Sequence, residues 1–350
     1  MSFTQFLPFL IRTTYKLAGR KKAKSLLSYV SNGEQFFYIN SLYNFEEKKT
    51  TNQLTLMLPG KGCAWAKKTG GCTMCGFSKK IEQIGGKFSD NDLIILYEVA
   101  EIMTTNDRPT DISIYNAGSF INDDEISENV QLKICKKVKK HPTIKSLLIE
   151  SRAEYIADKK ILSLKKELSD KKLIVAIGLE AQDDKIRNVY VKKGMSKQEY
   201  EQAIKILKQN NVKIATYILI KPIYLTEKEA IEEAIKSAEY AFSTGSDEVI
   251  FESSFIQEDT IMEKLYNEKK FKPPWLWSII EVVKKTYNLG DIRLGGFNDE
   301  PPPIAIPFNC PLCSEKIKNS LQKYRETNDI ELLNNLHCDC KKEWENIIKS

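Results

Sequence analysis

Short apolar segments alternate with longer amphipathic segments through most of the chain after residue 50. The short segments are rich in Ile, Val and Leu and have the length of strands, whereas the long ones repeat apolar residues at helical spacing. The predicted strands are 54–59, 111–116, 146–150, 173–178, 213–220 and 247–252. The predicted helices are about 90–105, 125–140, 154–169, 184–210 and 226–244.

Two of the predicted helices begin with a capping box. Ser196 is followed three residues later by Glu199, Thr226 is followed by Glu229, and Gly245 is placed to end the second helix. The alternation of strands and helices predicts an α/β fold with a parallel sheet and helices outside it. No G-x-G-x-x-G follows a predicted strand, so the pattern favours a partial or complete barrel over an open dinucleotide-binding sheet.

The composition is that of an ordinary soluble globular protein, with 42% hydrophobic and 29% charged residues in 350. No segment approaches the roughly 18 apolar residues that a membrane helix requires. The N-terminal sequence MSFTQFLPFLIRTTYK lacks the basic start and the cleavage site of a signal peptide, so we expect a packing helix. These features predict a cytoplasmic protein with no membrane partner.

The net charge of +6 arises from 53 basic residues, of which only seven are Arg. Basic clusters at 20–24 and 136–140 could contact the phosphates of an RNA such as tRNA. A solvated helix face explains each cluster equally well. The charge therefore permits a tRNA partner without requiring one.

Three of the eight cysteines lie in a glycine-rich loop after the first predicted strand. Cys63, Cys72 and Cys75 have the spacing C-x8-C-x2-C. Three thiolates from one loop suit three irons of a [4Fe–4S] cluster, which leaves the fourth iron open to a small molecule. Zinc is the alternative, but a structural zinc site takes four protein ligands and only three are local. Clustered cysteines without an export signal favour metal binding over disulfides.

Four further cysteines lie in the last fifty residues, after the proline run 301–303, in the pattern C-x2-C, a helix-sized spacer and C-x-C. Four thiolates suit a structural zinc ion, with an auxiliary iron–sulfur cluster as the alternative. These cysteines are Cys310, Cys313, Cys338 and Cys340. The expected division of the chain is an N-terminal helical extension (1–50), a barrel (51–300) and a cysteine-rich tail (301–350).

Polar residues follow several predicted strands, at the end where barrel enzymes place their chemistry. Arg152 could bind a carboxylate bidentately while Glu150 takes an ammonium or a ribose hydroxyl, unless the two form a structural ion pair. Charged side chains there, including Glu252 after the sixth strand, imply a polar cavity. The candidate ligand-binding residues are Asn116, Gly118, Ser119, Glu150, Arg152, Glu180 and Lys221.

These motifs resemble the radical S-adenosylmethionine (SAM) superfamily, in the branch of the Elongator catalytic subunit. The likeness is greatest to the radical SAM subunits of archaeosine synthases and covers nearly the whole chain, including the tail. The first cysteine gap exceeds the common C-x3-C-x2-C spacing by five residues, as is typical of this branch. The matching motifs are the cysteine loop, 116–120, 150–152, 178–180, 193–194, 219–222, 274–278 and 309–313.

The resemblance implies a partial (β/α)6 barrel, a [4Fe–4S] cluster whose open iron binds SAM, and an external electron donor. It also implies that SAM cleavage yields a radical that abstracts hydrogen from substrate. For the archaeosine family the substrate is tRNA with a lysine adduct of 7-cyano-7-deazaguanine in the D-loop. A partner subunit transfers the lysine, and the radical subunit acts as a lyase that leaves archaeosine.

Two alternatives remain open at this point. One is a different radical SAM reaction on a tRNA base, such as the wobble-uridine chemistry of Elongator. The residues after 300 are too few for the acetyltransferase domain of that enzyme. The other is a non-catalytic tRNA-binding scaffold with two structural metal sites, which would need a fourth ligand for the first cysteine cluster. No residue is assigned as catalytic.

Overall fold

One sheet of eight strands organises the protein. The computed structural model describes residues 13–14, 16–17, 36–77, 88–297 and 302–349. In this part of the chain the strand order is β1 to β8; β2 to β8 are parallel, and β1 is antiparallel to β2. The strands are β1 Phe37–Asn44, β2 Lys49–Met57, β3 Asp111–Tyr115, β4 Ser146–Ser151, β5 Lys172–Glu180, β6 Lys213–Ile220, β7 Glu248–Ser253 and β8 Asp291–Leu294.

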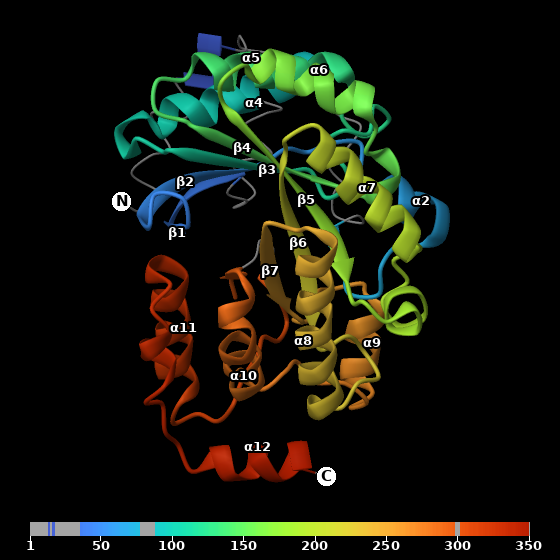
Figure 1. The fold of residues 1–350 in the computed structure, drawn as a ribbon, viewed down its shortest axis with the longest axis vertical. Helices are drawn as coiled ribbons and strands as arrows, with labels where there is room; N and C mark the ends of the chain where they lie inside the picture. Colours follow the sequence, from blue (N-terminus) through green and yellow to red (C-terminus); the bar gives the residue numbers. More distant parts are fainter. Residues whose placement is uncertain (1–12, 15, 18–35, 78–87, 298–301, 350) are drawn as a thin grey trace.

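Helices connect successive parallel strands and lie around the outer side of the sheet (Figure 1). The α-helices are α2 Ala64–Thr69, α4 Asp90–Met103, α5 Glu128–Lys140, α6 Asp158–Leu168, α7 Lys197–Gln209, α8 Glu227–Thr244, α9 Ile261–Asn267, α10 Leu276–Thr286, α11 Ser314–Thr327 and α12 Cys340–Lys349. Shorter helical turns are Thr105–Asp107, Ala153–Tyr155, Ile186–Tyr190, Tyr287–Leu289 and Ile330–Leu333. None of the described helices combines the length and apolar content of a membrane span.

The expected partial barrel is confirmed, but with eight strands instead of six. The six predicted strands correspond to β2 to β7. Strands β1 and β8 were missed because β1 mixes aromatic and polar residues on both faces and β8 has only four residues. Both predicted capping boxes form, and Gly245 ends α8 with a positive φ of 112°.

The N-terminal extension is only partly within the described residues. Most of residues 1–35 lie outside them, including all of the expected packing helix except residues 13, 14 and 16, which are helical. Residues 37–44 form strand β1 rather than a helix. The helical character expected up to residue 50 is therefore wrong for its last part, while the domain boundaries themselves stay a prediction.

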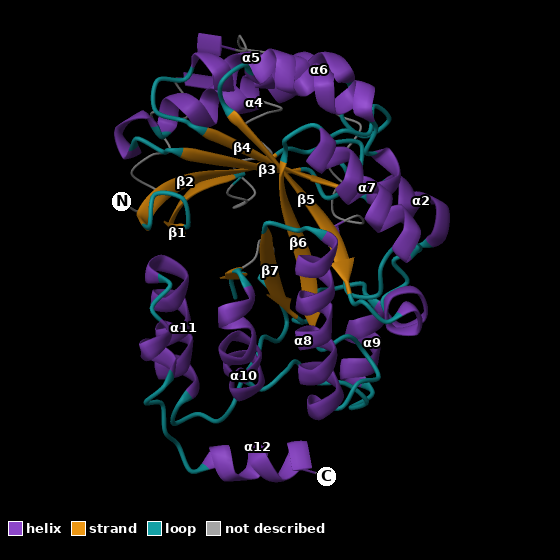
Figure 2. Cartoon of the chain, viewed as in Figure 1, coloured by secondary structure: helices purple, strands orange, loops and turns teal. Residues whose placement is uncertain are grey.

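Helix α11 of the tail spans the gap between the two sides of the open sheet. The Tyr324 hydroxyl donates to the carbonyl of Ile292 on β8 at 3.2 Å, and the Thr50 hydroxyl on β2 donates to the carbonyl of Glu326 at 2.6 Å. The apolar face of α11 packs into the core shared by β6 to β8, α8 and α10. Figure 2 shows α11 close to β1, on the side that the outer helices leave open.

Candidate active site

A cavity of about 920 Å³ occupies the concave side of the sheet. Its walls are inward-facing side chains, because alternate residues of a strand point to the same face. Leu148, Ala176 and Ile250 line the cavity and form an apolar cluster with Ala215. Around it lie polar and charged groups from the strand ends, from the cysteine loop and from α11. This is the polar cavity that the charged strand ends predict.

The cysteine loop closes one end of this cavity. Cys75 lines the cavity directly, and its backbone N–H donates to the carbonyl of Cys72 at 3.1 Å. Neighbouring segments hold the loop on both sides. The N–H of Thr73 donates to the carbonyl of Val191 at 3.0 Å, and the N–H of Gly76 donates to Oε1 of Gln257 at 2.8 Å. These bonds hold the backbone of the loop that carries the thiols.

The loop fits a cluster held by three thiolates better than a single ion. Among the described residues, only the four tail cysteines bring three or more potential ligand atoms within 4.8 Å of one another. The loop thiols do not form such a compact set, as expected if each binds a different iron. Burial raises the pKa of the Cys72 thiol to about 12, although the positive charge of the nearby Lys193 lowers it in part. A bound metal would offset the cost of the thiolate there.

The buried carboxylate of Glu125 organises the turn at 116–120 against the cysteine loop. It accepts hydrogen bonds from the backbone N–H of Ser119 at 2.5 Å and of Ala64 at 3.0 Å. A Cβ at Gly118 would overlap this carboxylate and approach Cys63. Glycine is therefore required at 118 by the protein's own packing. The sequence interpretation missed Glu125, although an acid shortly after a small-residue turn is a usable signal.

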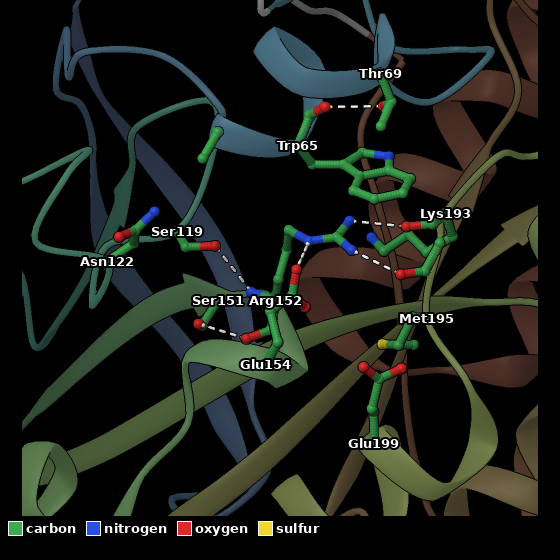
Figure 3. Close-up of polar contacts among 12 residues, drawn as sticks. Trp65, Thr69, Ser119, Asn122, Ser151, Arg152, Glu154, Lys193, Met195 and Glu199 are labelled. Carbon is green, nitrogen blue, oxygen red and sulfur yellow. Dashed lines mark hydrogen bonds and ion pairs between the residues drawn. The ribbon is translucent and has the colours of Figure 1, made fainter.

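Arg152 connects three segments around the cysteine loop (Figure 3). Its guanidinium lies 4.7 Å from the ring centroid of Trp65 in α2. It donates to the carbonyls of Lys193 at 2.9 Å and Gly194 at 3.1 Å and pairs with Glu154 at 2.5 Å. The ion pair thus involves Glu154, not Glu150. The expected contact of Arg152 with a cofactor carboxylate stays a prediction.

Two other candidates line the cavity as expected. Glu180 ends β5 with a φ of 67°, and its carboxylate pairs with Lys193 at 2.8 Å with both side chains buried. Burial alone would lower the pKa of Lys193, but the negative charges of Glu180 and Cys72 raise it by more, so the pKa is raised. Glu150 faces the lumen close to Tyr115 and Tyr217. These groups could bind the polar parts of a ligand placed against Cys75.

The remaining candidates do not line the cavity in the described part of the chain. Lys221 forms a buried ion pair with Glu227 and lies 5.6 Å from the ring centroid of Phe271. Asn116 is buried with both side-chain polar atoms unpaired. The hydroxyl of Ser119 accepts the backbone N–H of Arg152 at 3.0 Å. Direct cofactor contacts by these three side chains stay predictions.

The four tail cysteines form a compact site beside α10, α11 and α12. The Sγ–Sγ distances are 3.5 Å for Cys310–Cys313 and 3.6 Å for both Cys310–Cys338 and Cys313–Cys340. A tetrahedral ion with metal–sulfur bonds of 2.3 Å would place its ligands about 3.8 Å apart. Trp277 donates its indole N–H to Cys340 at 3.4 Å, as an outer hydrogen bond to a thiolate ligand would. The geometry fits one tetrahedral ion.

No model of a known protein family matches the chain. An uncharacterised protein of Methanocaldococcus jannaschii is 31% identical over 298 residues, which are 83% of this chain and 80% of that protein. The archaeosine synthase subunit beta of Methanosarcina acetivorans is 28% identical over 306 residues, 85% of this chain and 86% of that protein. The structure of Streptococcus suis SuiB bound to SAM matches with a TM-score of 0.51 and 12% identity, over 79% of this chain and 55% of SuiB. The structural match concerns the fold alone.

Proposed function

Because the chain is similar over about 85% of its length to archaeosine synthase beta subunits, at 27–28% identity, we propose that it is a radical SAM lyase that acts on modified tRNA. Its substrate would be the lysine adduct of 7-cyano-7-deazaguanine in the D-loop, and its product archaeosine. A partner subunit would supply the adduct, and an external donor the electron. The observation that carries the proposal is one large cavity with Cys75 at one end and charged side chains around it.

Residues of this chain would hold the cofactors in the following way. Cys63, Cys72 and Cys75 would each bind one iron of a [4Fe–4S] cluster. The backbone at Gly118 and the carboxylates of Glu150 and Glu180 line the cavity next to this loop and would contact SAM. When bound, the cluster and SAM supply the radical chemistry, while the protein positions the cofactor and excludes water.

The size and openness of the cavity suit a nucleotide substrate. Enzymes that modify a base extrude it from the nucleic acid into a pocket, at a cost of a few kcal/mol of unstacking. The cavity volume of about 920 Å³ leaves room for a base beside a cofactor. Tyr115 and Tyr217 project aromatic rings into this lumen, where a base could pack against them.

The test is to incubate reconstituted protein, SAM and a reductant with tRNA that carries the lysine adduct. We expect archaeosine among the tRNA nucleosides by mass spectrometry with the wild type, and none with Cys72→Ala, which should also lose iron and 5′-deoxyadenosine formation. If the adduct persists while SAM is cleaved, the substrate is a different one. Normal iron content and SAM cleavage in Cys72→Ala would contradict the cluster assignment.

A further inference from the structure

One wall of the cavity brings together charged side chains from distant parts of the chain. Glu252 lies near the end of β7, and Arg325 lies on α11 of the tail. Both line the cavity, and the two charges are close enough to attract each other. The polar face of α11 points inward here, since Lys318, Gln322 and Arg325 line the cavity while Ile317 and Leu321 are buried in the core. This wall is therefore built to face a polar ligand.

Two glycines after β8 lie against these charged groups, and the first of them makes room for the carboxylate. A Cβ at Gly295 would overlap the carboxylate of Glu252, so a larger residue there would displace it. At Gly296, the guanidinium of Arg325 lies 3.6 Å from the position that a Cβ would take. The carboxylate and the guanidinium thus lie against consecutive backbone positions, and both line the cavity. The sequence interpretation did not single out this Gly-Gly pair.

Arg325 differs from the other arginine on this wall in what it binds. Arg293 pairs with the buried carboxylate of Glu248 at 2.5 Å, which neutralises its charge locally. Arg325 instead donates to two neutral acceptors, the carbonyl of Leu294 at 2.9 Å and the side-chain oxygen of Gln322 at 2.5 Å. A guanidinium has five N–H donors in a planar fork, so these bonds fix its orientation and leave further donors for an anion.

We propose that Arg325 and Glu252 form a binding site for the zwitterionic end of an amino acid. Arg325 binds the α-carboxylate and Glu252 accepts from the α-ammonium group. This assignment rests on the proposed function, because the lysine part of the adduct carries that zwitterion at the far end of its aliphatic chain. The site lies on the α11 wall, whereas Cys75 and the groups expected to bind SAM lie at the cysteine loop.

The experiment compares three tRNA substrates made from different amines. One carries the lysine adduct, one the 1,5-diaminopentane adduct, which lacks the carboxylate, and one the 6-aminohexanoate adduct, which lacks the α-amino group. We expect the wild type to prefer lysine over each analogue by about 10- to 100-fold in kcat/KM, as for the loss of a hydrogen bond to a charged group. Arg325→Gln should no longer prefer the lysine adduct over the diaminopentane adduct. Glu252→Gln should no longer prefer the lysine adduct over the aminohexanoate adduct.

Three controls make the result specific. Lys323→Gln removes an exposed charge from α11 that does not line the cavity, and it should keep both preferences. Arg325→Lys keeps the charge without the fork and should keep part of the preference. Iron content and SAM cleavage without tRNA show that the variants are folded and loaded.

Two results would overturn the assignment while the proposed function stands. One is a wild type that converts all three adducts equally well, and the other is an Arg325→Gln variant that retains the wild-type preference. In the second case, a higher KM for SAM in Arg325→Gln would assign the pair to the cofactor instead. A wild type that converts none of the adducts overturns the proposed function and the zwitterion site together.

Discussion

Single charged residues at the strand ends serve different purposes that their sequence context does not separate. Arg152 and Lys221 both follow a strand and both carry a positive charge into a buried position. Arg152 joins α2 to the segment at 193–194, whereas Lys221 pairs with Glu227 away from the cavity. Whether each side chain faces a ligand depends on partners that lie far along the chain. Only the fold brings these partners close to it.

Arg152→Lys tests what the guanidinium does. A lysine keeps the charge but cannot reach both carbonyls or stack on Trp65 in the same way, so the free energy of unfolding should fall by about 1–3 kcal/mol. Anaerobic denaturant unfolding measures this, and calorimetry measures SAM binding in the same variant. Unchanged stability together with weaker SAM binding would place Arg152 in the cofactor site instead.

The buried carboxylate of Glu248 makes stability depend on pH. Burial alone would raise its pKa, but Arg293 and Lys213 outweigh burial and lower it below its usual 4.5. A carboxyl group whose pKa is lower in the folded state stabilises the fold above its unfolded pKa, and this contribution is lost as the pH falls through the folded pKa. The free energy of unfolding should therefore drop as the pH falls below about 4.5.

Glu248→Gln provides the comparison for this pH dependence. The variant should be less stable at neutral pH because two partly buried cations lose their charged partner. Its stability should also fall less steeply in acid, as measured by denaturant unfolding at several pH values. An equal slope in wild type and variant would assign the acid sensitivity to other groups.

At the scale of elements, the strands with apolar runs and the helices with capping boxes could be predicted, because their determinants are local. Strand β8 could not, since four residues carry too little pattern. Helix α11 was expected only as a spacer between cysteines. Its amphipathic sequence predicts one polar face. The sequence of the helix does not show whether that face contacts water or lines a cavity. The thiols of the cysteine loop could be found because their spacing is itself local.

The contact between the turn at 116–120 and the cysteine loop depends on Glu125. In Glu125→Gln an amide NH2 replaces one of the two oxygens that accept backbone N–H groups. We expect a loss of about 1–3 kcal/mol in unfolding free energy and less iron bound per chain after reconstitution. Asp124→Asn, at an exposed neighbouring position, should match the wild type in both measurements. Full iron content in Glu125→Gln would show that the contact between the turn and the loop is not needed for cluster binding.

At the scale of the whole molecule, the tail site fixes the wall that closes the cavity. Cys313 immediately precedes α11 and Cys340 begins α12, so a metal there ties both helices to α10 through Trp277. We propose that this metal is zinc, because the four thiolates fit one tetrahedral ion.

Metal analysis should find one zinc per chain in addition to the iron of one cluster. Cys338→Ser should lose the zinc and lower the free energy of unfolding, since the tail is too short to form its own core. The loop cluster should still form in this variant at reduced stability. Iron for more than one cluster per chain and no zinc in the wild type would contradict the assignment.

The closure of the cavity by α11 also has a consequence for how the protein is made. The bond from Thr50 to Glu326 joins positions 276 residues apart, and that from Arg293 to Tyr43 joins positions 250 apart. Synthesis proceeds from the N-terminus, and the ribosome exposes β1 and β2 long before α11. The barrel sheet can assemble while the chain is still growing, but its lumen stays open at the side. Helix α11, which is translated after all eight strands, completes the chamber.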